Sequence, residues 1–174
     1  MATNLHFIKN ITSNNEVSTL ELTDIFSADY DVYTLVCRNI DIKTGGNYPY
    51  VMWRYLKASD GSVDSTSNYD YSNAPLALIG THGTWRNQNQ TTFTHQYFDT
   101  NEKTSGGFVI NIYRPFDSST YTNTTSQSAS YYNGGRYQCG FKGASTHKVA
   151  QSNSGLKLET GTVNAEFNIY GVKG

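Results

Sequence analysis

The sequence has few charges, few cysteines and no long hydrophobic run. Charged residues make up 16% of the chain, well under the ~25% of an average soluble domain. The net charge is −1 and no basic stripe is present, so we expect no binding to nucleic acid. Since no apolar run approaches ~18–20 residues, we also expect no membrane span. The N-terminus lacks the hydrophobic core of a signal peptide, which predicts a protein made and kept in a cytoplasm until something releases it.

Cysteine is nearly absent, because Cys37 and Cys139 are the only two. We interpret them as buried free thiols. A single disulfide is the alternative, and it would require the two cysteines to lie on neighbouring strands. The length of 174 residues suits one domain that buries its core without disulfide or metal staples. We therefore expect a single domain over residues 1–174, with no internal repeat and no linker.

Signatures of catalysis are also missing. The four histidines form no His-x-His or His-x-x-x-His pair, so the sequence predicts no metal site. No Gly-x-Ser-x-Gly nucleophile elbow occurs. The acidic pairs Asp29/Asp31 and Asp60/Asp64 are interpreted as turn and surface residues, and a structural Ca²⁺ at one of these turns is the alternative. We expect neither an enzyme nor a bound cofactor.

Hydroxyl, amide and aromatic side chains are abundant instead. Aromatic residues reach 14%, with 14 Tyr, and Ser, Thr and Asn contribute 17, 21 and 17 residues. Thr and Tyr pack well on pleated surfaces, so this composition favours an all-β protein. It also suits a surface whose contacts are hydrogen bonds and ring faces rather than ion pairs.

Strand signals recur along the chain, and no stretch has the periodicity and caps of a helix. Residues 30–42 are largely apolar on both faces at the start, as in a central strand of a sandwich. Residues 161–174 place Ala165, Phe167 and Ile169 on one face. We expect this closing strand to be paired inside a sheet, since a loose one would fray. Further short strands are expected at 5–9, 17–22, 50–56, 69–71, 76–79, 91–98, 108–114, 149–151 and 156–158.

The remaining segments are polar. Residues 80–90 are predicted to form a loop. Residues 117–130, almost all Ser, Thr, Asn and Tyr, are expected to form a long exposed loop or a polar edge strand. Residues 131–137 predict a strand, a turn at Asn133-Gly134 and a second strand. About ten short strands separated by turns predict an all-β fold, an antiparallel β-sandwich of jelly-roll-like type.

Two motifs near the ends of the chain resemble a known family. Residues 22–36 contain a Phe26-Ser-x-x-Tyr30-x-x-Tyr33 turn and strand, and residues 167–173 read Phe-Asn-Ile-Tyr-Gly-Val-Lys. With the Trp-Arg-Tyr-Leu segment at 53–61, this pair resembles a family of small virion structural proteins of tailed bacteriophages, common in marine phages. The resemblance runs from end to end, but residues 80–130 have no counterpart in it. Asn164-Ala165 stand where the family often has Ser-Gly.

The resemblance implies a β-sandwich used in capsid decoration, in head fibres or in tail appendages, and it implies no known chemistry. The expected function is that of a non-enzymatic capsid decoration (cement) or fibre-type subunit. It would bind other virion proteins, either major capsid or tail proteins, as a homo-oligomer. The expected location is the virion, after synthesis in the host bacterial cytoplasm. The alternative is a tail-associated receptor-binding adhesin that recognises host surface glycans.

The aromatic residues of the two motifs are interpreted as core packing. Phe26 and Tyr30 are expected to plug the end of the sandwich, and Phe167 and Tyr170 are expected to join them from a neighbouring strand.

The candidate residues for binding a partner or a glycan lie elsewhere, among Asn, Gln and hydroxyl side chains. A flat ring suits the face of a sugar and amides suit its hydroxyls, whereas Tyr and Trp also dominate the hot spots of protein interfaces. Simple packing on an edge strand is the third interpretation. The set consists of Trp85, Arg86, Tyr121, Tyr131, Tyr132 and Tyr137.

Overall fold

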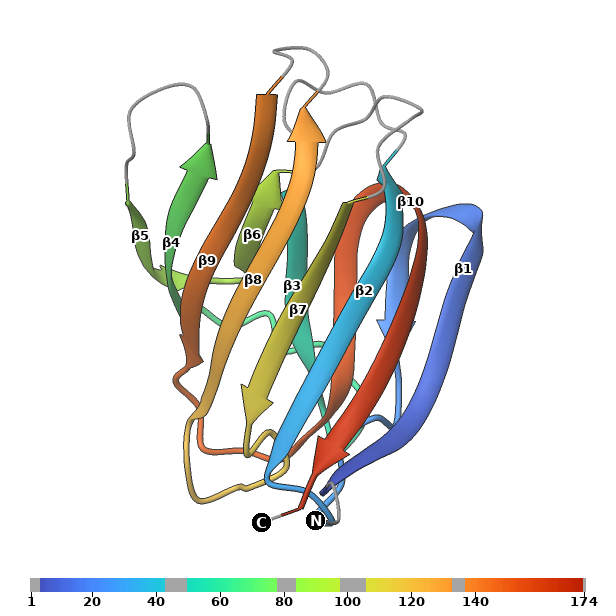
Figure 1. The fold of residues 1–174 in the computed structure, drawn as a ribbon. Coiled ribbons are helices and arrows are strands. Elements are labelled where there is room, and N and C mark those ends of the chain that lie inside the picture. Colours follow the sequence, from blue (N-terminus) through green and yellow to red (C-terminus); the bar gives the residue numbers. More distant parts are fainter. Residues whose placement is uncertain (1–3, 43–49, 78–83, 98–105, 133–136, 174) are drawn as a thin grey trace.

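The computed structural model describes residues 4–42, 50–77, 84–97, 106–132 and 137–173, which form an antiparallel β-sandwich (Figure 1). The predicted all-β fold is confirmed. No helix that could span a membrane occurs in these described ranges. Their strands are β1 (Leu5–Leu22), β2 (Val32–Ile42), β3 (Tyr50–Lys57), β4 (Tyr69–Ala77), β5 (Trp85–Gln90), β6 (Phe93–Tyr97), β7 (Gly106–Tyr113), β8 (Thr122–Tyr132), β9 (Tyr137–His147) and β10 (Asn153–Val172).

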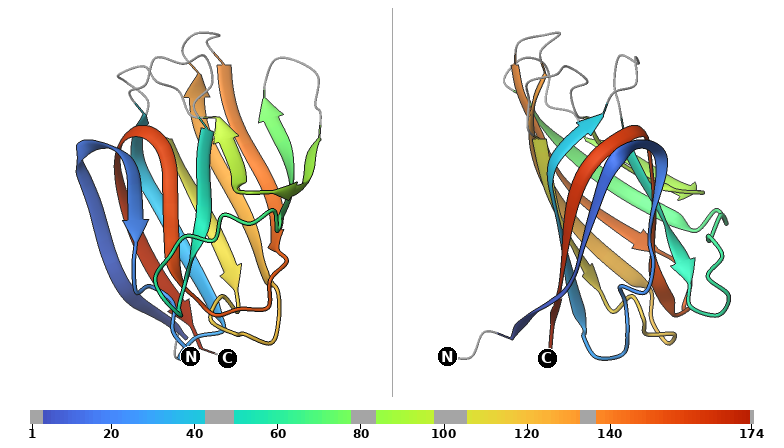
Figure 2. Two further views of the ribbon diagram at one scale, coloured as in Figure 1. Left: turned by 180° about the vertical axis from the view of Figure 1, so that it is seen from behind. Right: turned by 90° about the vertical axis from the view of Figure 1, so that its right-hand side faces the viewer.

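Two long strands, β1 and β10, arch over and take part in both sheets of the sandwich (Figure 2). The C-terminal half of β10 pairs with β2, its N-terminal half pairs with β3, and β1 follows β10 along both halves. The larger sheet therefore has the order β5-β4-β9-β8-β7-β2-β10-β1, and the smaller sheet contains β1, β10, β3 and β6. Strand β1 joins two segments that were expected as separate strands, 5–9 and 17–22. Strand β10 likewise joins the expected strands 156–158 and 161–174.

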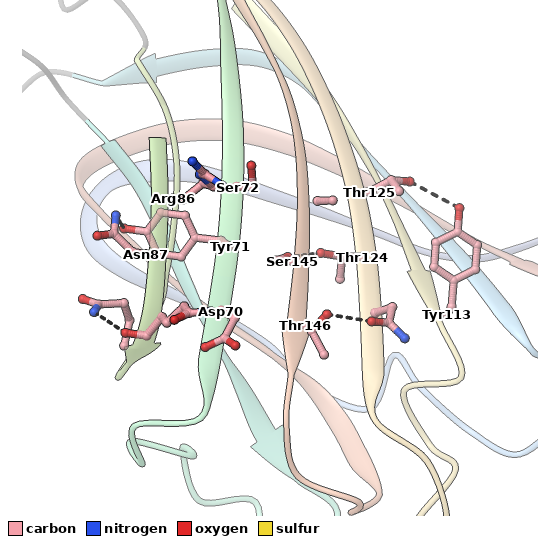
Figure 3. A pocket seen from close by; sticks show the side chains of 14 residues that line it. Asp70, Tyr71, Ser72, Arg86, Asn87, Tyr113, Thr124, Thr125, Ser145 and Thr146 are labelled. Atoms are coloured by element: carbon pink, nitrogen blue, oxygen red, sulfur yellow. Dashed lines mark hydrogen bonds between the residues drawn. The ribbon is translucent and has the colours of Figure 1, made fainter. Parts of the chain in front are cut away.

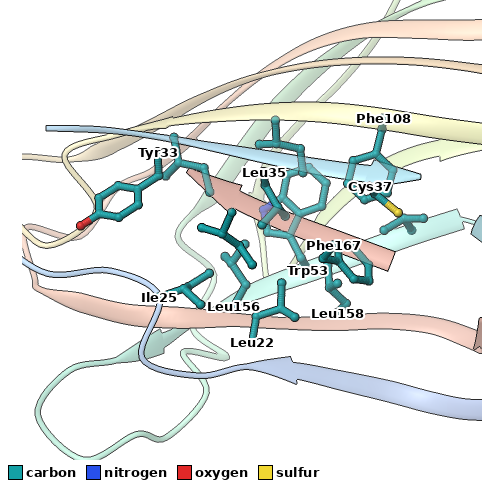
Figure 4. Packing of buried hydrophobic residues seen from close by; sticks show 14 of the residues in the cluster. Leu22, Ile25, Tyr33, Leu35, Cys37, Trp53, Phe108, Leu156, Leu158 and Phe167 are labelled. Atoms are coloured by element: carbon teal, nitrogen blue, oxygen red, sulfur yellow. The ribbon is translucent and has the colours of Figure 1, made fainter. Parts of the chain in front are cut away.

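The core lies between the two sheets and is rich in aromatic rings (Figure 4). The smaller sheet contributes Trp53 and Phe93, whose ring centroids are 5.5 Å apart. The larger sheet contributes Ala165, Phe167 and Ile169, all buried as their alternation predicts. Full burial of one large apolar side chain stabilises a fold by roughly 1.5–3 kcal/mol, so this layer holds the sheets together.

The two terminal motifs meet at one end of the sandwich. Three atoms of the Tyr30 ring would lie 2.4–2.6 Å from a Cβ at Gly171, so only glycine leaves room for the ring. The Tyr33 hydroxyl accepts a hydrogen bond from the Ser27 amide (2.7 Å) and donates one to the Ser27 carbonyl (2.8 Å). Phe26 packs edge-on against Tyr33, with 4.9 Å between centroids. The expectation that Phe26 and Tyr30 pack at this end of the core is confirmed.

Tyr170 differs from the prediction, because it does not point into the core. Along β10 the side chains alternate, and Tyr170 lies on the face opposite to the buried Phe167 and Ile169. Its ring is 5.8 Å from that of Phe7 on β1. The two-residue period of the strand, rather than aromatic character, decides which side this residue takes.

The middle of the chain contains two strands that differ from the prediction of a loop or of a polar edge strand. Residues 85–90, expected as part of a loop, form β5 and pair with β4. The segment expected as a loop or an edge strand contains most of β8, which lies inside the larger sheet between β7 and β9. Both expectations are wrong. Polar β5 forms an exposed edge strand beside β4. Polar β8 can lie inside the sheet because its buried hydroxyl groups find partners, as Thr124 Oγ1 does with Ser145 Oγ. The buried polar residues of β8 are Thr122, Thr124, Ser126 and Ser128.

Other local predictions have mixed outcomes. The segments expected at 69–71 and 76–79 are continuous as β4 through Ala77, and 78–79 lie outside the described residues. The hairpin at 131–137 is confirmed by the pairing of β8 with β9, whereas its turn, 133–136, lies outside the described residues. Residues 149–151 form no strand. Asp29 and Asp31 are exposed, as predicted for turn residues.

Asp64 is buried, whereas Asp60 is an exposed turn residue as predicted. Asp60 accepts hydrogen bonds from the amide (2.9 Å) and hydroxyl (2.7 Å) of Ser62. Asp64 is only 2% exposed and lies 2.9 Å from His147 Nε2. Burial alone would raise the pKa of Asp64, but hydrogen bonds from Thr66 and His147 outweigh it and lower the pKa. Burial lowers the pKa of His147 against the pull of Asp64, so a neutral His147 donates its Nε2–H to an ionised Asp64.

Cys37 is a buried free thiol, as predicted. Desolvation raises the pKa of its thiol well above the ordinary value, so the group stays protonated at neutral pH. The side chain of Cys139 lies outside the described residues.

Candidate binding hollow on the larger sheet

The outer face of the larger sheet carries rows of side chains that cross its strands. Residues directly opposite one another in antiparallel strands project to the same side, so the strand register defines each row. One row runs from Arg86 on β5 through Ser72, Ala144 and Thr125 to Asn111 on β7.

The neighbouring row runs from Asp70 on β4 through Thr146 and Asn123 to Tyr113 on β7. Most residues of these two rows line a hollow of about 730 Å³ (Figure 3). Thr124 and Ser145 alternate with the row residues and are buried on the opposite side of the sheet. The outward-facing lining residues are Asp70, Ser72, Arg86, Gln88, Tyr113, Asn123, Thr125, Ala144 and Thr146.

Hydrogen bonds between neighbouring strands hold several of these side chains in place. Thr146 donates its hydroxyl to Asn123 Oδ1 at 2.7 Å. The Tyr113 and Thr125 hydroxyl groups lie 3.3 Å apart, and both contacts are visible in Figure 3. Because Asn123 uses its oxygen, its amide nitrogen keeps two N–H donors for a ligand. Side chains that are already ordered on strands lose little entropy when a ligand binds.

Asp70 is the one carboxylate among the described residues that line the hollow, and it is already paired. Lys148 Nζ lies 2.9 Å from Asp70 Oδ1, and the Asn89 amide donates to the same oxygen at 2.8 Å. Burial alone would raise the pKa of Asp70, but these two hydrogen bonds outweigh it and lower the pKa. Asp70 is therefore ionised at neutral pH and neutralised by Lys148.

The predicted site residues Trp85 and Arg86 lie on opposite sides of β5. Arg86 lines the hollow. Trp85 lies beside the buried Phe141, with 6.0 Å between ring centroids, and is 40% exposed. Consecutive residues of a strand face opposite ways, so these two cannot act together on one ligand.

The predicted tyrosines lie outside the hollow or outside what is described. Tyr121 directly precedes β8 and is 54% exposed, but it does not line the hollow. Tyr131, Tyr132 and Tyr137 lie at the hairpin end of β8 and β9, where Tyr132 pairs with Tyr137. Their side chains lie outside the described residues.

Most residues of the hollow were not predicted from the sequence. The sequence predicts Tyr113 near the end of a strand, and Asn123 and Thr125 in a loop or an edge strand. The alternation of Thr122, Thr124 and Ser126 with Asn123 and Thr125 is the signal that could have revealed a strand with one buried hydroxyl face. The register that joins these residues into one surface is not visible in any single segment.

Comparison with known proteins shows no family model and no curated protein sequence that matches the chain. Among solved structures, the CBM2 module of the evolved Dit of Lactobacillus casei BL23 phage J-1 has a TM-score of 0.27 and 6% identity, over 94% of this chain and 76% of that one. The marine PL-14 alginate lyase from Aplysia kurodai has a TM-score of 0.28 and 7% identity, over 96% and 89%. An aerolysin-like protein of Bombina maxima reaches only 0.14, with 12% identity over 95% and 96%. Similarity this low assigns neither family nor function.

Proposed function

We propose that this protein is a non-enzymatic, glycan-binding β-sandwich of a tailed-phage virion, and that the glycan binds in the hollow on the larger sheet. The observation that carries the binding part is the hollow itself, a preformed outer surface lined by hydroxyl, amide and guanidinium groups. The virion part comes from the motifs at 22–36 and 167–173. In this proposal the protein is a tail-associated adhesin for host surface glycans.

The chemistry of the hollow suits a saccharide. A sugar presents several hydroxyl groups, each both donor and acceptor, and needs partners spread over a surface rather than one charged point. Asn123, Thr125 and Thr146 offer such partners on two adjacent strands. Tyr113 stands at the β7 side of the hollow with 39% of its surface exposed, so its ring can cover an apolar sugar face.

Binding without cleavage is proposed because of how the carboxylate is used. Glycoside hydrolysis ordinarily takes two carboxyl groups on either side of the scissile bond. Asp70 is alone among the described lining residues, and its charge is taken up by Lys148. A paired and ionised carboxylate is a poor general acid.

A glycan array with the isolated protein tests the proposal, followed by titration of the best saccharide. Tyr113→Ala and Asn123→Ala should each weaken binding, by roughly tenfold for the loss of one well-placed contact. Tyr121→Ala is the matched control, since Tyr121 is also an exposed tyrosine (54% against 39% for Tyr113) but lies outside the hollow. Absence of any saccharide ligand, or full binding by both hollow variants, would overturn the proposal.

A second candidate, a capsid decoration or fibre-type subunit, is favoured by the edge strand β1. Leu5 and Phe7 are 50% and 60% exposed and lie opposite Val172 and Tyr170 of β10. Exposed apolar and aromatic side chains of this kind are used in protein interfaces. In this role the protein would bind major capsid or tail proteins, as a homo-oligomer.

The location of the protein on the particle separates the two candidates. A decoration subunit should co-purify with heads stripped of tails, and Phe7→Ser should release it while Tyr121→Ser does not. Labelled protein found only at tail tips would contradict decoration and support the adhesin.

A further inference from the structure

We propose that the hollow selects an anionic saccharide, one that carries carboxylate, sulfate or phosphate groups, and that Arg86 and Lys142 make this selection. The inference rests on the proposed glycan-binding function and adds the chemical class of the ligand.

The outer face around the hollow is positively charged although the chain is not. The chain carries a net charge of −1. The register of β5, β4 and β9 places Arg86, Lys142 and Asp70 on this face. Arg86 and Asp70 line the hollow, and Lys142 lies one row beyond the lining residues. Asp70 is neutralised by Lys148 at 2.9 Å, which leaves the two cations Arg86 and Lys142 without compensation by a described carboxylate.

Most other basic side chains of the described residues have a carboxylate within 4.0 Å. Neither Arg86 nor Lys142 has such a partner among those residues, and both are exposed. Their charges therefore contribute no ion pair to the described fold and are available to a ligand. The paired residues are Arg38, Arg54, Arg114, Lys148 and Lys157.

Arg86 and Lys142 lie close enough to act on one short saccharide. Arg86 is in the row of Ser72 and Ala144, and Lys142 precedes Ala144 by two positions on β9. Neighbouring strands lie ~4.8 Å apart and two residues along a strand span ~6.6 Å, so the two Cα atoms lie roughly 12 Å apart. Long side chains from these positions can reach anions on the same or on adjacent sugar units.

Arg86 and Lys142 suit complementary parts of the task. The guanidinium of Arg86 presents a planar fork that binds a carboxylate, sulfate or phosphate through two parallel hydrogen bonds. The ammonium of Lys142 is a point charge on a flexible stem and tolerates different positions of the second anion. Asn123, Thr125 and Tyr113 would contact the hydroxyl groups and the ring face of the same chain.

Polysaccharide pairs that differ only in charge test the inference. Polygalacturonate against its methyl ester tests carboxylate, dextran sulfate against dextran tests sulfate, and phosphomannan against mannan tests phosphate. Binding is measured by titration at ~150 mM salt, where charges more than ~8 Å apart are largely screened. We expect the anionic member of at least one pair to bind, and the neutral member to bind at least tenfold more weakly.

Variants that remove one positive charge then test whether Arg86 and Lys142 select the anionic saccharide. Arg86→Gln and Lys142→Gln should each weaken binding of the anionic member by roughly tenfold, the value of one charge-assisted hydrogen bond. Lys173→Gln is the matched control, because it removes the same charge from the exposed end of β10, two strands beyond β7. Equal melting temperatures of the three variants would confirm that the fold is intact.

The outcomes separate this inference from the proposed function. Equal binding of neutral and anionic members, with loss on Tyr113→Ala, would overturn the charge selection and leave the glycan-binding function standing. Selection by Arg86 and Lys142 would also be overturned if Lys173→Gln weakened binding as much as Arg86→Gln, because the net charge of the protein would then explain the preference. If none of the six polysaccharides and no arrayed glycan binds, both ideas fail.

Discussion

The contact between Tyr30 and Gly171 yields a sharp stability prediction, for the substitution Gly171→Ala. A Cβ at Gly171 would lie 2.4 Å from Tyr30 Cγ and 2.6 Å from both Cδ atoms, closer than real Cβ atoms come to other carbons. Strand β10 cannot shift away, because Gly171 is paired with His6 of β1 on one side and with Tyr33 of β2 on the other. The Tyr30 ring must therefore move out of its packed position.

The size of the effect follows from overpacking rather than from backbone strain. Inserting a methyl group into a well-packed site typically costs ~1–3 kcal/mol, so we expect Gly171→Ala to lower the free energy of unfolding by about 2 kcal/mol. In a domain of this length ~1 kcal/mol corresponds to ~2–4 °C in the melting temperature. The melting temperature should fall by roughly 4–8 °C as a result.

Urea unfolding followed by intrinsic fluorescence, with and without Tyr30→Ala, measures the contact itself. If the clash with the Tyr30 ring is the cause, Gly171→Ala should cost under about 0.5 kcal/mol in the Tyr30→Ala background. Gly61→Ala is the comparison, because Gly61 has a positive φ of 71° and nothing within 4 Å of its Cβ position. Its cost, about 1 kcal/mol of backbone strain, should be the same with and without Tyr30. An undiminished Gly171→Ala cost in the Tyr30→Ala background would refute the reasoning.

Two further predictions concern buried titratable groups. Because His147 is held neutral and Asp64 ionised in the folded protein, the unfolded chain takes up more protons on acidification, so the free energy of unfolding should decrease as the pH falls below about 6.5. His147→Gln should remove the part of this decrease that lies above about pH 5. The measurement is the free energy of unfolding in urea at pH 7 and at pH 5, and an equal decrease in the variant and the wild type would contradict a role of the pair. Cys37, with its raised pKa and buried position, should not react with a thiol reagent in the folded Cys139→Ser variant and should react fully in urea. Rapid labelling without urea would contradict its burial.

The sequence predicts strands well where hydrophobic contrast marks the two faces. In β10, Ala165, Phe167 and Ile169 alternate with polar residues, and all three are buried. In β8 the contrast is missing, because Thr124 is buried and Thr125 is exposed although their side chains are the same. Only the flanking strands β7 and β9 decide which of them faces the core.

The candidate site was less predictable than the fold for a related reason. Arg86 was predicted and lines the hollow, but it was grouped with Trp85, which the strand period places on the other face. The hollow is assembled by pairing across five strands, from Arg86 on β5 to Tyr113 on β7. Long-range register of this kind leaves no local pattern in the chain.

The shared arch of β1 and β10 also sets an order of events during synthesis. Leu5 pairs with Val172 and Leu22 with Leu156, so β1 leaves the ribosome long before its partner strand β10 is made. The hairpins of β7, β8 and β9 are local and can close while synthesis continues. Loop closure over nearly the whole chain makes pairing of β1 a slow and late step. Until then β1 lacks its partner strand, and its apolar residues Leu5 and Phe7 make it a segment prone to association.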